Sequence, residues 1–187
     1  MRIISGYLKG KKIFEPLDLK TRPLRDLVKE TIFNIIQHSK KIKIDLKDAY
    51  VLDLFSGTGS FGLECLSRGA KTVTFFENYT PSINVLKKNL TNLKLENDSE
   101  IITKNALELD NILSNDNKFD LIFIDPPFKN NDLNKLIDKI SSVKITNHQS
   151  LIIIHRNKKT KEVINNKFQI YVERTLGLSK IFFGKII

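Results

Sequence analysis

The four residues Asp125-Pro126-Pro127-Phe128 have the types and spacing best suited to chemistry in this sequence. They follow the apolar run 119–124, which predicts a buried parallel strand, and prolines end a strand because they cannot donate to its hydrogen-bond ladder. The motif should therefore lie at the carboxyl end of a strand, where open α/β sheets bind ligands. A carboxylate, a free carbonyl and an aromatic face at that place suit a planar base that bears an exocyclic amine.

Such an amine is a poor nucleophile because its lone pair is delocalised into the ring, and to react in a direct displacement it must be placed in line with the carbon it attacks. The Asp125 carboxylate and the Pro126 carbonyl can accept both amine protons and so help the nitrogen become pyramidal. Phe128 can stack on the base, a contact worth about 1–3 kcal/mol. A base inside a helix must be unpaired or flipped out to reach such a site. Seen alone, Asp-Pro-Pro is also an ordinary turn that ends a strand.

The loop that follows the predicted strand 50–55 carries a second candidate site. Gly57, Gly59 and Gly62 have the G-x-G-x-x-G spacing, in which glycines let the chain turn tightly and let a ligand touch the backbone. The spacing alone is a weak signal and also fits a dinucleotide. Asp53 lies on the strand before the loop, and a carboxylate there suits the cationic groups of S-adenosylmethionine better than a pyrophosphate. The alternative is that Asp53 only caps its own loop.

Polar residues also follow the next two predicted strands. Glu77 ends the second strand, where it can accept hydrogen bonds from ribose hydroxyls or be an exposed acid at a strand end. Asn105 and Ala106 follow the third strand and can line the adenine side of a nucleoside, although a plain turn asparagine is the alternative. The predicted cofactor residues on these loops are Asp53, Phe55, Ser56, Gly57, Gly59, Glu77, Asn105 and Ala106.

The composition predicts one globular, cytoplasmic domain. The chain has 187 residues, of which 41% are hydrophobic and 28% charged. Its apolar runs are no longer than a strand, so we expect no transmembrane helix, and its beginning lacks the apolar stretch of a signal peptide. The single cysteine, Cys65, is expected in the core and fits a cytosolic location.

The three histidines make no metal-ligand spacing, so we expect no metal. His155, at a strand end, either borders the site or lies at the surface.

Positive charge is concentrated at the start of the chain. The net charge is +10, and residues 1–43 hold 11 Lys or Arg against four Asp or Glu. A basic segment of this kind indicates a polyanionic partner such as nucleic acid. The alternative is a lysine-rich surface that is simply solvated.

The remaining pattern alternates strand and helix, which indicates an α/β fold with a parallel sheet and helices on both faces. Residues 1–22 are rich in turns and predict a basic β-hairpin or small extension, after which Pro23 can open a helix. The short link around Gly177 predicts that the last two strands form an antiparallel hairpin. The predicted strands are 50–55, 72–77, 100–103, 119–124, 150–154, 168–173 and 179–186, and the predicted helices are 23–39, 61–68, 81–92 and 131–141.

Four blocks of this sequence resemble one known family. They are Arg2 to Lys12, Arg22 to Asn34, Asp53 to Ala70, and Asp125 to Phe128. Together they resemble the class I S-adenosylmethionine-dependent methyltransferases and, more narrowly, the bacterial small-subunit ribosomal RNA guanine-N2 methyltransferases of the RsmD family. The resemblance covers nearly the whole chain. Leu24 and Arg25 depart from it, since the family usually has two threonines there.

The resemblance implies a Rossmann-like fold, with a seven-stranded, mostly parallel sheet whose last strand is antiparallel. It implies a single domain, 1–187, in which a basic hairpin extension (1–22) contacts RNA and a catalytic core (23–187) binds S-adenosylmethionine without a metal. Arg22 begins the block that would cover the methionine end of the cofactor. In the family the fifth strand commonly ends in an acid, whereas here it ends in His155-Arg156. The implied RNA-binding residues are Arg2, Lys9, Lys11, Lys12, Arg22 and Arg25.

The activity implied is methylation of the exocyclic N2 of a guanine in a 16S ribosomal RNA hairpin loop. The substrate would be an assembled or partly assembled 30S particle, and we expect the protein to be a monomer. Three other functions remain open: an adenine-N6 or cytosine-N4 methyltransferase, an NAD-dependent oxidoreductase built on the glycine loop, and a non-catalytic RNA-binding module. A DNA methyltransferase would need a target-recognition domain, for which this chain has no spare length.

Overall fold

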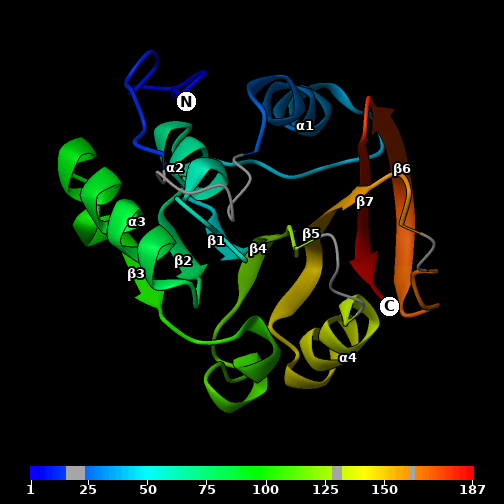
Figure 1. The fold of residues 1–187 in the computed structure, drawn as a ribbon. Helices are drawn as coiled ribbons and strands as arrows, with labels where there is room; N and C mark the ends of the chain where they lie inside the picture. The colour runs from blue at the N-terminus through cyan, green and yellow to red at the C-terminus, as the bar shows by residue number, and fades with distance from the viewer. Residues whose placement is uncertain (16–23, 128–131, 161–162) are drawn as a thin grey trace.

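The computed structural model of the protein describes residues 1–15, 24–127, 132–160 and 163–187. Figure 1 shows one sheet with helices packed on its two faces. The seven strands lie in the order β3-β2-β1-β4-β5-β7-β6. Six strands run in one direction, and β7 is antiparallel to both of its neighbours. The strands are β1 (Tyr50–Leu54), β2 (Thr72–Phe76), β3 (Ser99–Ile102), β4 (Phe119–Ile124), β5 (Thr146–Asn157), β6 (Phe168–Leu176) and β7 (Ser179–Ile186).

Two hydrophobic cores lie on the two faces of the sheet, because successive side chains of a strand point to opposite faces. In β1, Val51 belongs to the core beneath the first three helices, whereas Leu52 and Leu54 belong to the core beneath the fourth. All three are fully buried, as expected for a central strand of a parallel sheet. The first face is covered by α1 (Asp26–His38), α2 (Ser60–Ser67) and α3 (Thr80–Leu93), and the second by α4 (Leu133–Val143) and the 3-10 helix η2 (Ala106–Asn111).

The predicted architecture is therefore confirmed, including the reversed last strand and the hairpin of β6 and β7. The main differences from the prediction concern the first helix, the fifth strand and two short 3-10 helices. The first helix begins at Asp26, and Pro23, which was expected to open it, lies outside the described residues. The fifth strand is longer than predicted and runs from Thr146 to Asn157, because Thr146 pairs with Phe119 of β4 and the carboxyl half pairs with β7 up to Asn157. The 3-10 helices η1 (Glu96–Asp98) and η2 have no counterpart in the prediction. None of the helices in the described residues is long and apolar enough to cross a membrane.

The N-terminal arm, residues 1–15, forms a hairpin with an antiparallel bridge between Arg2 and Lys12. The N–H of Ile3 donates to the carbonyl of Lys11 at 2.9 Å. The predicted hairpin is thus confirmed, but in a short form. It does not widen into two full strands because the backbone groups that follow bond to α2 instead.

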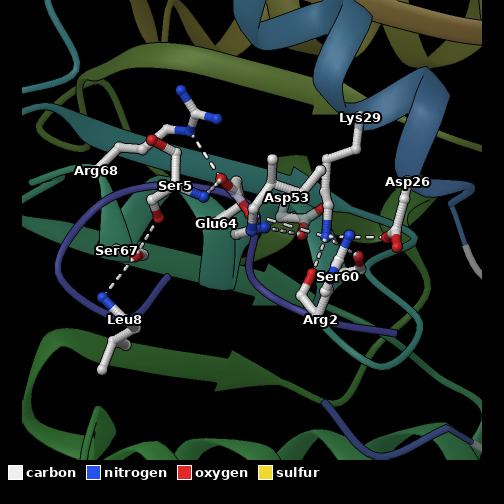
Figure 2. Close-up of polar contacts among 12 residues, drawn as sticks. Arg2, Ser5, Leu8, Asp26, Lys29, Asp53, Ser60, Glu64, Ser67 and Arg68 are labelled. Atoms are coloured by element: carbon white, nitrogen blue, oxygen red, sulfur yellow. Dashed lines mark hydrogen bonds and ion pairs between the residues drawn. The ribbon is translucent and has the colours of Figure 1, made fainter. Parts of the chain in front are cut away.

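Glu64 on α2 is the residue that holds the N-terminal arm against the domain. Its Oε2 accepts the N–H of Ile4 at 2.7 Å, and its Oε1 accepts the N–H of Ser5 at 2.9 Å (Figure 2). Gly6 follows with φ at +83°, and a Cβ at this position would lie 1.7 Å from the carbonyl oxygen of Ser67. A side chain at residue 6 would therefore push the arm off the helix.

Candidate active site

The register of the sheet brings three predicted site segments to one edge. Leu54, the last residue of β1, is opposite Phe76 of β2 and Ile124 of β4. These parallel strands therefore end at the same level, and the residues that follow them meet at the carboxyl edge of the sheet. Glu77 and Asp125 are the first of those residues.

The candidate acids on β1 and β4 also share a face. Asp53 lies between Leu52 and Leu54, which point into the α4 core, so its side chain points to the face covered by α1, α2 and α3. Phe123 belongs to that same face, and Asp125, two residues later, continues the alternation. The backbone N–H of Asp125 donates to the carbonyl of Leu54 at 3.4 Å, which extends the sheet up to the motif.

The three glycines of the loop have different tasks. A Cβ at Gly59 would lie 2.4 Å from a methyl carbon of Leu86 on α3, and a Cβ at Gly62 would lie 2.3 Å from the ring of Phe75 on β2. These two glycines let the helices pack closely. At Gly57, where φ is +55°, a Cβ would meet no heavy atom of the described residues within 4 Å. The backbone of Gly57 therefore borders open space that a ligand can enter.

Glu77 holds the glycine loop from the end of β2. Its Oε2 accepts the N–H of Gly57 at 2.7 Å, and its Oε1 accepts the N–H groups of Asn78 and Tyr79 at 2.9 and 2.8 Å. The side chain is buried, unlike the exposed strand-end acid that was the alternative. A carboxylate has about four lone-pair sites, so Glu77 can still accept one hydroxyl of a ribose.

Asp53 is a buried acid that already has a structural partner. It is 1% exposed, and its Oδ2 accepts the N–H of Gly62 at 3.0 Å in the first turn of α2. Burial raises the pKa of Asp53 to about 8; the Gly62 hydrogen bond opposes this rise, whereas the charges of Asp125 and Glu77 add to it. Asp53 thus caps its own loop, and the three acids are close enough to repel one another.

Asp125 is the partly exposed acid of the group. Its Oδ1 lies 2.8 Å from Nδ1 of His155, which lies in the buried part of β5 and is 6% exposed. Pro126 is buried and Pro127 is exposed. Phe128, the predicted stacking residue, lies outside the described residues.

The residues after β3, which were predicted to line the adenine side of a nucleoside, also have structural contacts of their own. Asn105 precedes η2 and caps it, since its Oδ1 accepts the N–H of Leu107 at 3.0 Å. Ala106 is buried in the α4 core. Phe55 and Ser56 lie in the glycine loop, Phe55 half-buried with φ at +61° and Ser56 buried. A non-glycine residue at positive φ is uncommon and is often found at functional sites.

The predicted RNA-binding residues lie at the surface where the structure describes them. Their side chains are exposed on the N-terminal arm and just before α1, and Arg22 lies outside the described residues. The exposed residues of this set are Arg2, Lys9, Lys11, Lys12 and Arg25.

Lys29 is a buried lysine that the sequence patterns did not single out. It has no exposed surface, and its Nζ donates to the carbonyl of Arg2 at 2.9 Å and to Oγ of Ser60 at 3.2 Å (Figure 2). Burial lowers its pKa, and the carboxylates of Glu64 and Asp26, at 3.8 and 3.7 Å, oppose that shift. Lys29 therefore joins the N-terminal arm and α1 to the residue that begins α2.

Asn89 on α3 makes a second link of this kind. Its Oδ1 accepts the N–H of Phe14 at 2.7 Å, and its Nδ2 donates to the carbonyls of Phe14 and Thr58 at 3.2 and 3.0 Å. The side chain is fully buried. The glycine loop is thereby tied to the far end of the N-terminal arm, a link for which the sequence offers no local signal.

The site as a whole suits a ligand that carries positive charge and hydroxyl groups. Asp53, Glu77 and Asp125 supply acceptors at one edge, and the open backbone of Gly57 lies beside Glu77. Acceptors and open backbone of this kind match the ammonium, sulfonium and ribose groups of S-adenosylmethionine. Among the described residues, no group of three His, Cys, Asp or Glu side chains is arranged to hold a metal ion.

Comparison with known proteins agrees with this geometry. Residues 1–185 match the family described as conserved hypothetical protein 95. The ribosomal RNA small subunit methyltransferase D of Haemophilus influenzae is 33% identical over 179 residues, which covers 95% of this chain and 90% of the relative. The protein of the same name from Buchnera aphidicola of Acyrthosiphon pisum is 34% identical over 173 residues, which covers 92% of this chain and 86% of the relative.

Solved structures give the same result. A candidate methyltransferase of Escherichia coli, yhhF, superposes with a TM-score of 0.83 at 27% identity and covers 100% of this chain and 97% of that chain. A candidate methylase of Haemophilus influenzae superposes with a TM-score of 0.74 at 31% identity, covering 98% of this chain and 96% of that one. Because the family model spans nearly the whole sequence and its relatives do too, the chain belongs to the conserved hypothetical protein 95 family, that of the RsmD methyltransferases.

Proposed function

We propose that the protein transfers a methyl group from S-adenosylmethionine to the exocyclic N2 of a guanine in small-subunit ribosomal RNA. The observation that carries the proposal is that Asp53, Glu77 and Asp125 lie at a common edge of the sheet, where Asp53 and Asp125 also share a face. Asp53 and Glu77, which suit a cationic cofactor, thereby lie close to Asp125, which suits an amine. The names of the relatives support ribosomal RNA of the small subunit as the substrate.

The proposed cofactor residues hold S-adenosylmethionine in place and compensate its positive charge. When bound, S-adenosylmethionine supplies an activated methyl group. Glu77 accepts a ribose hydroxyl while it keeps the loop in place through Gly57. Asp53, whose raised pKa leaves it largely protonated in the ligand-free protein near neutral pH, gives up its proton when the positive charge of the cofactor lies beside it. Arg22, Phe55, Ser56, Gly59, Asn105 and Ala106 complete the proposed cofactor set.

Asp125 acts on the base. Its Oδ1 is engaged by His155, so the second carboxylate oxygen, Oδ2, is the one that faces an amine proton. The carbonyl of Pro126 accepts the other proton, Pro127 keeps the turn rigid, and Phe128 stacks on the base. The two acceptors draw the nitrogen lone pair out of conjugation at the moment the methyl group is attacked.

The RNA is held by the basic N-terminal arm and by Arg22 and Arg25. Their contacts are to phosphates, which position the RNA without reading its sequence. We further propose that the substrate is ribosomal RNA in an assembled or partly assembled 30S particle, and that the protein is a cytoplasmic monomer.

Replacing Asp125 tests the proposal directly. We expect Asp125→Ala to reduce methylation of small-subunit RNA by at least about a hundredfold, because the variant lacks an acceptor that is used in the transition state. Binding of S-adenosylhomocysteine, measured by calorimetry, should persist. Asp116→Ala, at an exposed aspartate in the turn before β4, is the matched control and should keep full activity. Unchanged turnover in Asp125→Ala would refute the assigned role.

The same assay separates the rival activities. Mass spectrometry of digested RNA should find N2-methylguanosine, whereas N6-methyladenosine would indicate the adenine-specific alternative. Thermal stabilisation by S-adenosylhomocysteine, with none by NAD, would set aside an oxidoreductase. A protein that binds the RNA and the cofactor but methylates neither guanine nor adenine would be a binding module.

A further inference from the structure

A hydrogen-bonded chain of three side chains connects the Asp125 motif to the antiparallel strand β7. Nδ1 of His155 lies 2.8 Å from Oδ1 of Asp125, and Nε2 of the same ring lies 2.8 Å from Oγ of Ser179. The three residues come from the end of β4, from β5 and from the start of β7. The ring is 6% exposed, so both of its nitrogens are satisfied inside the protein.

We propose that His155 is a positioning residue for Asp125, held in its orientation by Ser179, and that its protonation controls how strongly Asp125 accepts an amine proton. The inference rests on the proposed function, because it assigns a task to Asp125 in methyl transfer. His155 itself touches neither the cofactor nor the base. It acts by fixing which oxygen of the carboxylate is free to face the site.

The proton on Nδ1 is retained in both charge states of the ring. Asp125 is an acceptor, so Nδ1 must carry the proton that joins them. When the ring is neutral, Nε2 accepts the hydroxyl proton of Ser179; when the ring is charged, Nε2 donates to the Ser179 oxygen. A serine hydroxyl serves both states by rotating. The geometry of Asp125 is therefore constant across the titration, and only the charge beside it changes.

The charged neighbours of the ring determine the pKa of His155. Burial lowers the pKa of His155, but the charge and hydrogen bond of Asp125 raise it by more, and the Arg156 guanidinium next to it on β5 works against the rise. On β7 the neighbour is the uncharged Ser179. The net effect is a pKa above the ordinary 6.5. Below that pKa the imidazolium draws electron density from the carboxylate; above it, Asp125 is the stronger acceptor.

Two substitutions separate positioning from mere packing. His155→Asn keeps an N–H close to the position of Nδ1 but does not titrate, whereas His155→Leu removes the donor and keeps the bulk. We expect wild-type kcat to fall on the acid side with a midpoint above pH 6.5. In His155→Asn this acid limb should be absent and kcat should remain within about threefold of its maximum. In His155→Leu, kcat should fall about ten- to a hundredfold at every pH, with KM for S-adenosylmethionine unchanged.

A measurement without substrate separates this inference from the proposed function. The imidazole of His155, followed by NMR in the protein alone, should titrate above pH 6.5 in the wild type and at a lower pH in Asp125→Asn. An identical midpoint in the two proteins would overturn the link. So would an acid limb that survives in His155→Asn, or a loss of activity in His155→Asn equal to that in His155→Leu. If the NMR shift is found but no RNA is methylated, the link stands and the proposed function fails.

Discussion

The pairing of Asp125 with His155 illustrates what a sequence pattern can and cannot reach at the scale of single residues. Asp125 was predicted from its own neighbours, because a strand followed by two prolines gives its position. His155 was placed only at a strand end, with a surface position left open. Their contact spans 30 positions of sequence and depends on β4 and β5 being adjacent with Ile124 opposite Ile154. No local pattern contains that information.

The buried carboxyl of Asp53 should make the stability of the ligand-free protein depend on pH. Its pKa is about 8 in the folded protein, against an ordinary 3.8, so the folded state binds this proton more tightly than the unfolded state. The stabilisation is therefore complete below about pH 4 and is lost as pH rises through 8. We expect it to lower the free energy of unfolding by about 3–6 kcal/mol over that range.

Urea denaturation at pH 5 and pH 9 checks this expectation. Asp53→Asn keeps the size of the side chain and the acceptor for Gly62 but does not titrate. Its unfolding free energy should change less between the two pH values than that of the wild type. Equal changes in the two proteins would show that Asp53 keeps an ordinary affinity for its proton.

At the scale of elements, Glu64 is the residue on which the docking of the N-terminal arm depends. It accepts two backbone N–H groups of the arm, and its Oε1 also accepts Nε of Arg68 at 2.8 Å. It is also a partner of the buried Lys29. A glutamine has a single acceptor oxygen and brings two unwanted donors, so it cannot replace these contacts.

We therefore expect Glu64→Gln to destabilise the protein by about 3–5 kcal/mol, the usual cost of removing one partner of a buried ion pair. Glu96→Gln, at an exposed position of η1, is the matched control and should change stability by less than about 0.5 kcal/mol. Chemical denaturation gives both values. A loss in Glu64→Gln no larger than that in the control would mean that the arm is held by its apolar residues, Ile3 and Ile13, which are buried in the core beneath α1, α2 and α3.

The elements were predictable to the extent that their signals are local. The central strands are continuous apolar runs bounded by turns, and β1, β2 and β4 lie within one residue of the predicted limits. The helix α3 begins with a proline in its first turn, as predicted from Pro81. In contrast, η1 and η2 are too short to show a periodicity. Lys29 is polar by type, and it is buried through contacts with Arg2 of the N-terminal arm and Ser60 of α2, both distant in sequence.

At the scale of the whole molecule, the positive charge of the first residues is presented on an arm that is fixed to the catalytic domain. Lys9 and Lys11 are exposed on that arm, while Lys29 and Asn89 connect the arm to the residues around the glycine loop. Charge alone had left a solvated surface as an alternative to RNA binding. The rigid attachment makes the arm a surface that can position an RNA relative to the site, rather than a freely moving tail.

Removing two of these charges should weaken RNA binding in a salt-dependent way. We expect Lys9→Ala with Lys11→Ala to reduce affinity for a small-subunit RNA hairpin, and to lower the slope of log affinity against log salt by about 0.7 for each phosphate that is no longer neutralised. The control is Lys43→Ala with Lys47→Ala, which removes two exposed charges before β1, at the opposite edge of the sheet from Asp125. Titration of a labelled RNA at several salt concentrations measures both slopes. Equal slopes in the two variants would indicate that the arm makes no specific phosphate contacts.

The double-sided burial of the central strands has a consequence for how this sheet is aligned. A strand with apolar side chains on both faces can slip by one position against its neighbours without exposing much hydrophobic surface. Hydrophobic burial alone therefore does not select its register. Asp53 selects the register of β1, because a slip by one residue would turn its carboxylate into the hydrophobic core beneath α4, away from the N–H of Gly62. His155 selects the register of β5 in the same way. The polar groups of the candidate site therefore also fix the register of the strands that carry them. We expect a single residue inserted or deleted upstream of Asp53 or His155 in its strand to cause misfolding, and not only a loss of activity.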